Sequence, residues 1–172
     1  MQLKETKEIL NKFAKYVIQQ SRTNLTKRDK NSSKALYNSL DYRYKATTNG
    51  FGIQFLMDEY GVYQDKGVRG ANAYYADRAT SQSPFSFKTS SKIPPVKTLA
   101  DWAKKRNIRL RDDKGKFTKG NYNTIGFLIA RSIKDKGIRA SLFFTKPFEK
   151  AYKDLPTDLV KGFINDIEIT IE

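Results

Sequence analysis

The sequence predicts an α+β fold in which several helices pack on one face of a small antiparallel sheet. Two observations support this prediction. Residues 41–57 form two alternating runs across Asn49-Gly50, as in a β-hairpin, and other segments repeat apolar residues every three or four positions, as helices do. The 172 residues, 38% of them hydrophobic, suit one domain with its own core, so we expect a single domain over residues 1–172.

The first element is expected to be an amphipathic helix whose pattern fades after Gln20. Ile9, Phe13 and Val17 recur every four residues, and lysine and glutamate residues take the other side. Residues 21–33 are polar and basic, and we expect a fraying helix end or a loop there.

The hairpin is the clearest local pattern. Aromatic and basic residues alternate before Asn49-Gly50, and apolar residues alternate after it. Asn-Gly supplies the two positive-φ positions that a tight hairpin turn requires. One face of the hairpin is therefore expected to be aromatic and buried.

The segment after the hairpin changes character. A short helix and a turn are predicted over residues 59–70, where Tyr60 and Tyr63 lie three apart. Residues 70–93 show no sustained period and are expected to form an extended arm or loop. Such a long irregular stretch is uncommon inside a compact domain, which favours a functional role for it.

The second half of the chain is predicted to be mainly helical. Pro94-Pro95 opens a helix, a turn follows over residues 112–120, and another helix with Leu128 inward ends at Gly137. The C-terminal part, residues 154–172, is predicted to be a helix followed by a short strand over 167–171, because isoleucines alternate there. The inward residues of this last helix are expected to be Leu159, Val160, Phe163 and Ile164.

Composition excludes several kinds of chemistry. The chain has no cysteine and no histidine, which removes thiolate metal sites, cysteine nucleophiles and histidine-based catalytic triads. No apolar run approaches the roughly 18 residues of a membrane span, and residues 1–18 are amphipathic instead of signal-like. We expect a soluble protein without membrane contact.

One enzymatic alternative comes from the carboxylates. Asp58, Glu59 and Asp65 lie close together in the sequence and Lys66 follows, so they offer the groups of a magnesium-dependent nuclease. Their spacing matches no ordered metal motif, and no phosphate-binding glycine loop is present. We therefore expect no catalytic residue, no metal and no cofactor.

Positive charge is concentrated in one segment. The net charge is +15, and residues 92–139, with 14 basic and 4 acidic residues, hold +10 of it. Residues 140–172 hold 4 basic and 6 acidic residues, hence −2. A basic patch attracts nucleic acid or an acidic protein surface, although it is also compatible with a solvated face that aids solubility. The patch residues are Lys104, Lys105, Arg106, Arg109, Arg111, Lys114, Lys116 and Lys119.

Two segments resemble small virion proteins of tailed bacteriophages, the neck or tail-completion proteins that join head to tail. Residues 60–70 read YGVYQDKGVRG, and residues 127–148 end in FFTKPF. The similar pattern is a helix, an antiparallel hairpin, a Tyr–Tyr turn with glycine, and a Phe-Phe segment that leads into a helix. It covers residues 35–153.

The resemblance implies a non-catalytic virion protein, made in the bacterial host cytoplasm, that forms a ring of six or twelve copies. Its implied partners are the adjoining portal or adaptor and tail proteins, with DNA in the channel. A ring subunit needs segments that reach its neighbours, and residues 70–93 and 167–171 are candidates. The expected partner-binding residues are Tyr60, Tyr63, Lys66, Arg69, Phe85 and Phe87, and for the two tyrosines an ordinary core role is an alternative of at least equal weight.

A second function fits the same sequence. A basic nucleic-acid-binding protein would use residues 92–139, because a row of cations is all that phosphate contacts require. No known DNA- or RNA-binding module is evident, however.

Overall fold

The computed structural model describes residues 3–30, 33–47, 50–72, 74, 83–118 and 120–171. It divides into two compact units, which we describe separately: unit 1, Met1–Gly61 with Leu142–Glu172, and unit 2, Val62–Ser141. The predicted α+β class is confirmed, since helices accompany two small antiparallel sheets. The single domain expected over residues 1–172 stays a prediction.

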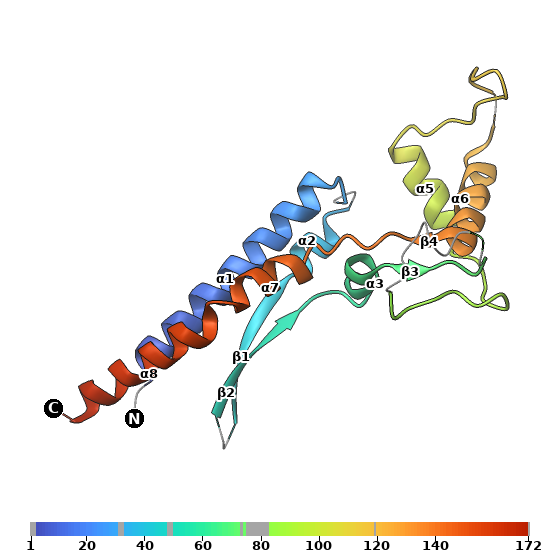
Figure 1. Ribbon diagram of the computed structural model, residues 1–172. Coiled ribbons are helices and arrows are strands. Elements are labelled where there is room, and N and C mark those ends of the chain that lie inside the picture. Colours follow the sequence, from blue (N-terminus) through green and yellow to red (C-terminus); the bar gives the residue numbers. More distant parts are fainter. Residues whose placement is uncertain are drawn as a thin grey trace. The chain divides into compact units, whose positions relative to one another are not determined.

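Unit 1 is built from both ends of the chain. Its helices α7 and α8 follow one another along α1 (Figure 1), and α1 contacts both of them. Its elements are α1 (Lys4–Lys27), α2 (Ala35–Ser39), β1 (Asp41–Thr47), β2 (Gly50–Leu56), α7 (Thr145–Tyr152) and α8 (Leu155–Ile171).

The predicted hairpin is confirmed and packs its apolar face on the helices. Strands β1 and β2 pair antiparallel, with Tyr42 opposite Phe55. The Phe55 ring lies edge-on to Phe13 of α1 at 6.0 Å and to Phe148 of α7 at 5.9 Å between ring centroids. The Tyr42 hydroxyl donates a hydrogen bond to the Asn11 side chain, which ties the hairpin to α1. Aromatic contacts across three elements thus form the centre of unit 1.

Helix α1 is longer than its apolar stripe predicted, because polar residues after Gln20 fit a helix interior. The Ser21 hydroxyl is buried and donates to the Val17 carbonyl at 2.7 Å, and Thr23 bonds back to its own preceding turn in the same way. Side chains bonded to a carbonyl four residues back need no water. Leu25, fully buried, then fixes the last turns in the core.

The C-terminal helix closes unit 1 through a buried carboxylate. Asp166 of α8 accepts hydrogen bonds from the backbone N–H groups of Glu5 and Thr6, at 2.9 and 3.0 Å, and from the Thr6 hydroxyl at 2.8 Å. The first N–H groups of a helix have no partner within the helix. A residue 160 positions away therefore completes the start of α1.

Two predictions for the C-terminal segment are wrong. Residues 167–171 continue α8 and form no strand, so the isoleucine alternation there is misleading. The expected inward face is also wrong: Val160, Phe163 and Ile164 are 61%, 45% and 49% exposed. The helix turns a different stripe to α1, which contains Leu155, Leu159, Gly162 and Asp166.

Unit 2 is continuous in sequence. Its helix α3 (Tyr60–Lys66) starts at the boundary with unit 1, and β3 (Val68–Arg69), α5 (Val96–Lys105), α6 (Tyr122–Lys136) and β4 (Gly137–Ile138) follow. Helices α5 and α6 pack side by side (Figure 1). None of the helices in the described part of the chain is long and apolar enough to cross a membrane.

Helices α5 and α6 approach closely at Gly126. A Cβ atom there would lie 2.6 Å from the Val96 carbonyl oxygen and 2.8 Å from the Ala100 nitrogen. Backbone atoms cannot move aside as a side-chain end can. The crossing therefore requires glycine at this position.

We predict that Gly126→Ala destabilises the protein by about 1–3 kcal/mol in urea unfolding, because overpacking outweighs the gain in helix propensity. Gly162→Ala is the matched control, since the nearest contact of its Cβ would be the Ile9 side-chain end at 2.5 Å, whereas the nearest backbone atom, Thr6 N, lies 3.4 Å away. This variant should lose less stability. A larger loss for Gly162→Ala than for Gly126→Ala would contradict the backbone argument.

Asp166 gives a prediction for acid stability. Burial raises the pKa of its carboxyl group, but hydrogen bonds from Thr6 and Glu5 outweigh burial and hold the pKa below its usual value. A carboxylate with a lowered folded-state pKa stabilises the fold above its unfolded-state pKa, and loses this effect as pH falls through the folded-state pKa.

We expect Asp166→Asn to lower the thermal midpoint by a few degrees at neutral pH. The difference from wild type should narrow as the pH falls below about 4. Circular-dichroism melts over this range measure both effects. Glu149→Gln, at an exposed carboxylate of the same unit, should leave the midpoint nearly unchanged. If the thermal midpoint of Asp166→Asn equals that of wild type at neutral pH, the hydrogen bonds of Asp166 to the start of α1 do not stabilise unit 1.

Candidate functional site

Segments from the two ends of unit 2 meet in the fold. Strands β3 and β4 pair antiparallel, with Val68 opposite Ile138 and Arg69 opposite Gly137. Beside them, the N–H and hydroxyl groups of Ser141 both donate to the Gln64 carbonyl, at 3.1 and 2.6 Å. Residues about 70 positions apart in the sequence thus form one small ladder.

The described part of the predicted arm is bound to the other side of β3. The Arg69 N–H donates to the Phe85 carbonyl at 2.8 Å, and the Phe87 N–H donates to the Arg69 carbonyl at 2.9 Å. The buried Ser83 hydroxyl donates to the Gly67 carbonyl at 2.8 Å. Residues 83–87 are therefore held by their own chain, whereas residues 75–82 of the arm lie outside the described residues.

Several expected partner-binding residues come together around β3. The Tyr63 and Phe85 rings pack edge to face at 4.7 Å, and Arg69 lies between Phe85 and Phe87 in the backbone pairing. Both Tyr60 and Tyr63 are about half exposed, which is not typical of core tyrosines.

Tyr60 and Lys66 are the first and last residues of helix α3. Partial burial and the nearby Asp58 carboxylate raise the pKa of the Tyr60 phenol, although a backbone hydrogen bond at Leu36 opposes this. Tyr60 therefore stays a neutral hydrogen-bonding group at physiological pH. Lys66, at the end of α3, is exposed.

The basic patch centres on an ordered loop between α5 and α6, which we call the finger (residues 107–118). Arg111 and Phe117 are bridged across it, and the Thr118 N–H donates to the Leu110 carbonyl at 3.0 Å. At its tip, one carboxylate oxygen of Asp112 accepts from the N–H groups of Lys114 and Lys116, at 3.0 and 2.8 Å. The finger is thus a small hairpin held by its own hydrogen bonds.

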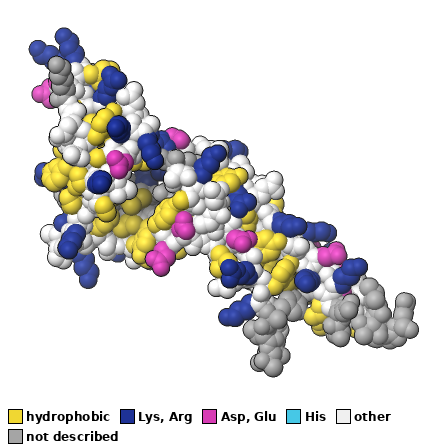
Figure 2. Space-filling view, turned by 180° about the vertical axis from the view of Figure 1, so that it is seen from behind, with side chains coloured by type: hydrophobic (Ala, Val, Ile, Leu, Met, Phe, Trp, Pro, Cys, Tyr) yellow, Lys and Arg dark blue, Asp and Glu magenta, His cyan; other side chains and the backbone are white. Residues whose placement is uncertain are grey.

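One face of the finger carries an aromatic ring between two cations. The Phe117 side chain is 60% exposed, and the guanidinium carbons of Arg111 and Arg109 lie 4.3 and 5.8 Å from its ring centroid. Figure 2 shows Lys and Arg side chains beside hydrophobic ones on the projecting loop of this unit. The predicted patch residue Lys119 lies outside the described residues.

The remaining patch residues lie at the end of α5. Lys104 and Lys105 are exposed in its last turn, and the Arg106 guanidinium lies 5.3 Å from the Trp102 ring centroid. Cations in the last turn of a helix also complement its dipole. Lys104, Lys105 and Arg106 therefore stabilise the end of helix α5 and also add to the positive surface.

The acidic residues were considered above as ligands of a metal ion. Within the described ranges, no group of three or more acidic side chains is placed to hold a metal ion. Asp65 is buried, whereas Glu59 is exposed. The structure thus offers no support for the nuclease alternative.

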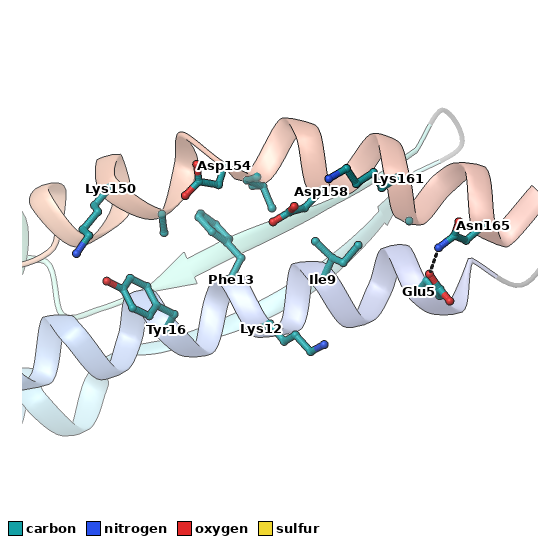
Figure 3. A pocket seen from close by; sticks show the side chains of 13 residues that line it. Glu5, Ile9, Lys12, Phe13, Tyr16, Lys150, Asp154, Asp158, Lys161 and Asn165 are labelled. Atoms are coloured by element: carbon teal, nitrogen blue, oxygen red, sulfur yellow. Dashed lines mark hydrogen bonds between the residues drawn. The ribbon is translucent and has the colours of Figure 1, made fainter.

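Unit 1 has a groove of about 630 Å³ between α1 and the C-terminal helices. Figure 3 shows side chains of both sides around it, with Asn165 donating to Glu5 at 2.8 Å. Its charged residues balance, with three carboxylates and three amines, so it favours no ion of either sign. The charged lining residues are Glu5, Lys12, Lys150, Asp154, Asp158 and Lys161.

Two exposed apolar surfaces are not predicted by the sequence patterns. On α8 they are Val160, Phe163 and Ile164, defined here as the α8 stripe; on α6 they are Phe127 and Leu128, both about half exposed. Leu128 was expected to be inward, and that prediction is wrong. A signal was present, since Leu155, Leu159, Gly162 and Asp166 repeat at helical spacing and mark the opposite face of α8.

Comparison with known proteins adds no relative. No family model, no curated protein and no solved structure matches the chain. The likeness to neck proteins therefore depends on the residues of this chain alone.

The β3–β4 ladder depends on Gly137. Its φ is +82°, and a Cβ atom there would lie 2.1 Å from the Val68 carbonyl oxygen. Both the left-handed conformation and the close backbone approach favour glycine.

We therefore expect Gly137→Ala to break the pairing of Val68 with Ile138 and to speed hydrogen exchange at the amides of the ladder by at least tenfold. The α1, α7 and α8 amides of unit 1 serve as the internal control. Unchanged protection in the ladder would show that this glycine is dispensable.

Proposed function

We propose that this chain is a non-catalytic structural protein of a tailed-phage virion, a neck or tail-completion component. It would form a ring of six or twelve copies that joins the portal or adaptor to the tail. The observation that carries the proposal is the α8 stripe, because contiguous exposed apolar side chains are typical of interaction surfaces.

A second copy is the partner that best fits the α8 stripe. Helix α6 presents Phe127 and Leu128, and its sequence carries three basic residues and one acidic residue, hence +2. Helix α8 carries one basic and three acidic residues, hence −2. Two different surfaces with complementary apolar and charged groups make a head-to-tail contact, and such contacts form a ring when the rotation between successive copies closes.

The resemblance agrees with this proposal. Its two segments pair on β3 and β4, so they form one structural feature instead of two unrelated short matches. The proposal places the mature protein in the virion, after synthesis in the host cytoplasm.

The test is the native mass of the purified protein. We expect the wild type to assemble to six or twelve times the chain mass of 19.8 kDa. Phe163→Lys should leave the helix content unchanged but reduce the assembly to monomers, because it puts a cation in the apolar contact, facing a basic helix.

Phe117→Lys, on the finger, is the matched control and should assemble as the wild type does. A wild-type chain that stays monomeric at its highest attainable concentration would contradict the proposal. Equal loss of assembly in both variants would contradict the assignment of the contact between copies to the α8 stripe.

A further inference from the structure

We infer that the finger binds the phosphodiester backbone of nucleic acid, independent of base sequence. This inference does not depend on ring formation. It rests on three observations of unit 2: cations without carboxylate partners, a rigid loop that presents them, and an exposed aromatic ring among them.

The cations of the finger are available to a ligand. Among the described residues, no carboxylate lies within salt-bridge distance of Arg109, Arg111, Lys114 or Lys116. The tip also carries two exposed acidic residues, Asp112 and Asp113. Asp112 uses one oxygen to accept from the N–H groups of Lys114 and Lys116, whose side chains stay exposed to a ligand.

The finger holds these cations in place before a ligand arrives. Its stem is fixed by the bond from the Thr118 N–H to the Leu110 carbonyl, and its base by the Ile108 N–H, which donates to Ala103 of α5 at 2.9 Å. The Arg111 guanidinium also donates to the Gly115 carbonyl at 3.1 Å. A preformed loop loses less conformational entropy on binding than a flexible one.

The guanidinium groups are further oriented by Phe117. The guanidinium carbons of Arg111 and Arg109 lie 4.3 and 5.8 Å from the centroid of the Phe117 ring. Cation–π attraction therefore keeps both guanidinium groups next to this ring. Because both guanidinium groups lie against the same Phe117 ring, they are close to each other. Adjacent phosphates of one strand can then be contacted together.

Nucleic acid fits this surface better than an acidic protein does. Cores of protein interfaces are poor in lysine and rich in apolar groups, whereas nucleic-acid interfaces are polar and strongly positive. The described finger exposes one large apolar side chain, Phe117, among its cations. It also projects beyond the α5–α6 pair (Figure 1), as a convex element that follows a backbone would.

The experiment measures anisotropy of a labelled short DNA duplex of arbitrary sequence, titrated with the full chain between about 50 and 200 mM salt. We expect binding at low salt with a log–log slope of several units. Arg109→Gln/Arg111→Gln should make the slope less negative by about 2 and weaken low-salt binding by roughly tenfold or more, because each lost phosphate contact removes about one unit.

Two further variants keep the result interpretable. Arg28→Gln/Arg43→Gln removes the same charge from exposed positions of unit 1 and should change binding little. Lys114→Gln/Lys116→Gln leaves the stem and the Phe117 contacts intact, so it should weaken binding even if the arginine variant disturbs the loop.

Three outcomes would overturn the inference. These are no binding at about 50 mM salt, an equal loss in the Arg28→Gln/Arg43→Gln control, or tighter binding of polyglutamate than of the duplex at equal charge. The last result would identify an acidic protein as the partner. None of them bears on the mass measurement, so the ring proposal and this inference can fail separately.

Discussion

The closure of α1 by α8 is the interaction on which unit 1 depends. Asp166 supplies acceptors for the first N–H groups of α1, and Gly162 lets the two helices approach. The first and last helices of the chain are therefore joined, and unit 2 is inserted between the two segments of unit 1. Because closure uses one face of α8, the opposite apolar face is left exposed.

Unit 2 depends on a different kind of contact, the close approach of one backbone segment to another. Gly126 at the α5–α6 crossing and Gly137 in the β3–β4 ladder occupy positions where a Cβ atom would meet main-chain atoms. Few large side chains are buried here, so the unit relies on hydrogen bonds and small residues. Hydrogen bonds and small residues therefore allow this short, strongly basic unit to hold the finger, which carries the exposed cations.

Local structure could be predicted from the sequence wherever a residue type fixes the backbone. Asn49-Gly50 located the hairpin, and Pro94-Pro95 marked the start of α5. The length of α1 was missed because Ser21 satisfies its hydroxyl within the helix, which apolar periodicity does not reveal. The strand expected over residues 167–171 was wrong because alternation over five residues is too short to outweigh the helix that precedes it.

The sites were less predictable, since they depend on contacts across long sequence separations. Charge alone indicated the basic patch that contains the finger, but not the placement of Arg109 and Arg111 on Phe117. Tyr63, Arg69 and Phe85 were selected from local sequence, and their meeting at β3 requires the fold. The exposed face of α8 was misassigned because that helix has apolar residues on two sides, and only Asp166 and Gly162 decide which side is buried.

We propose that the helical unit with its exposed apolar stripe, together with the basic finger, makes this chain a building block of a larger nucleoprotein particle. The decisive measurement is quantitative mass spectrometry of purified virions of the proposed phage. We expect the chain to be a tightly held particle component with a copy number of six or twelve. Absence from the virions would contradict it.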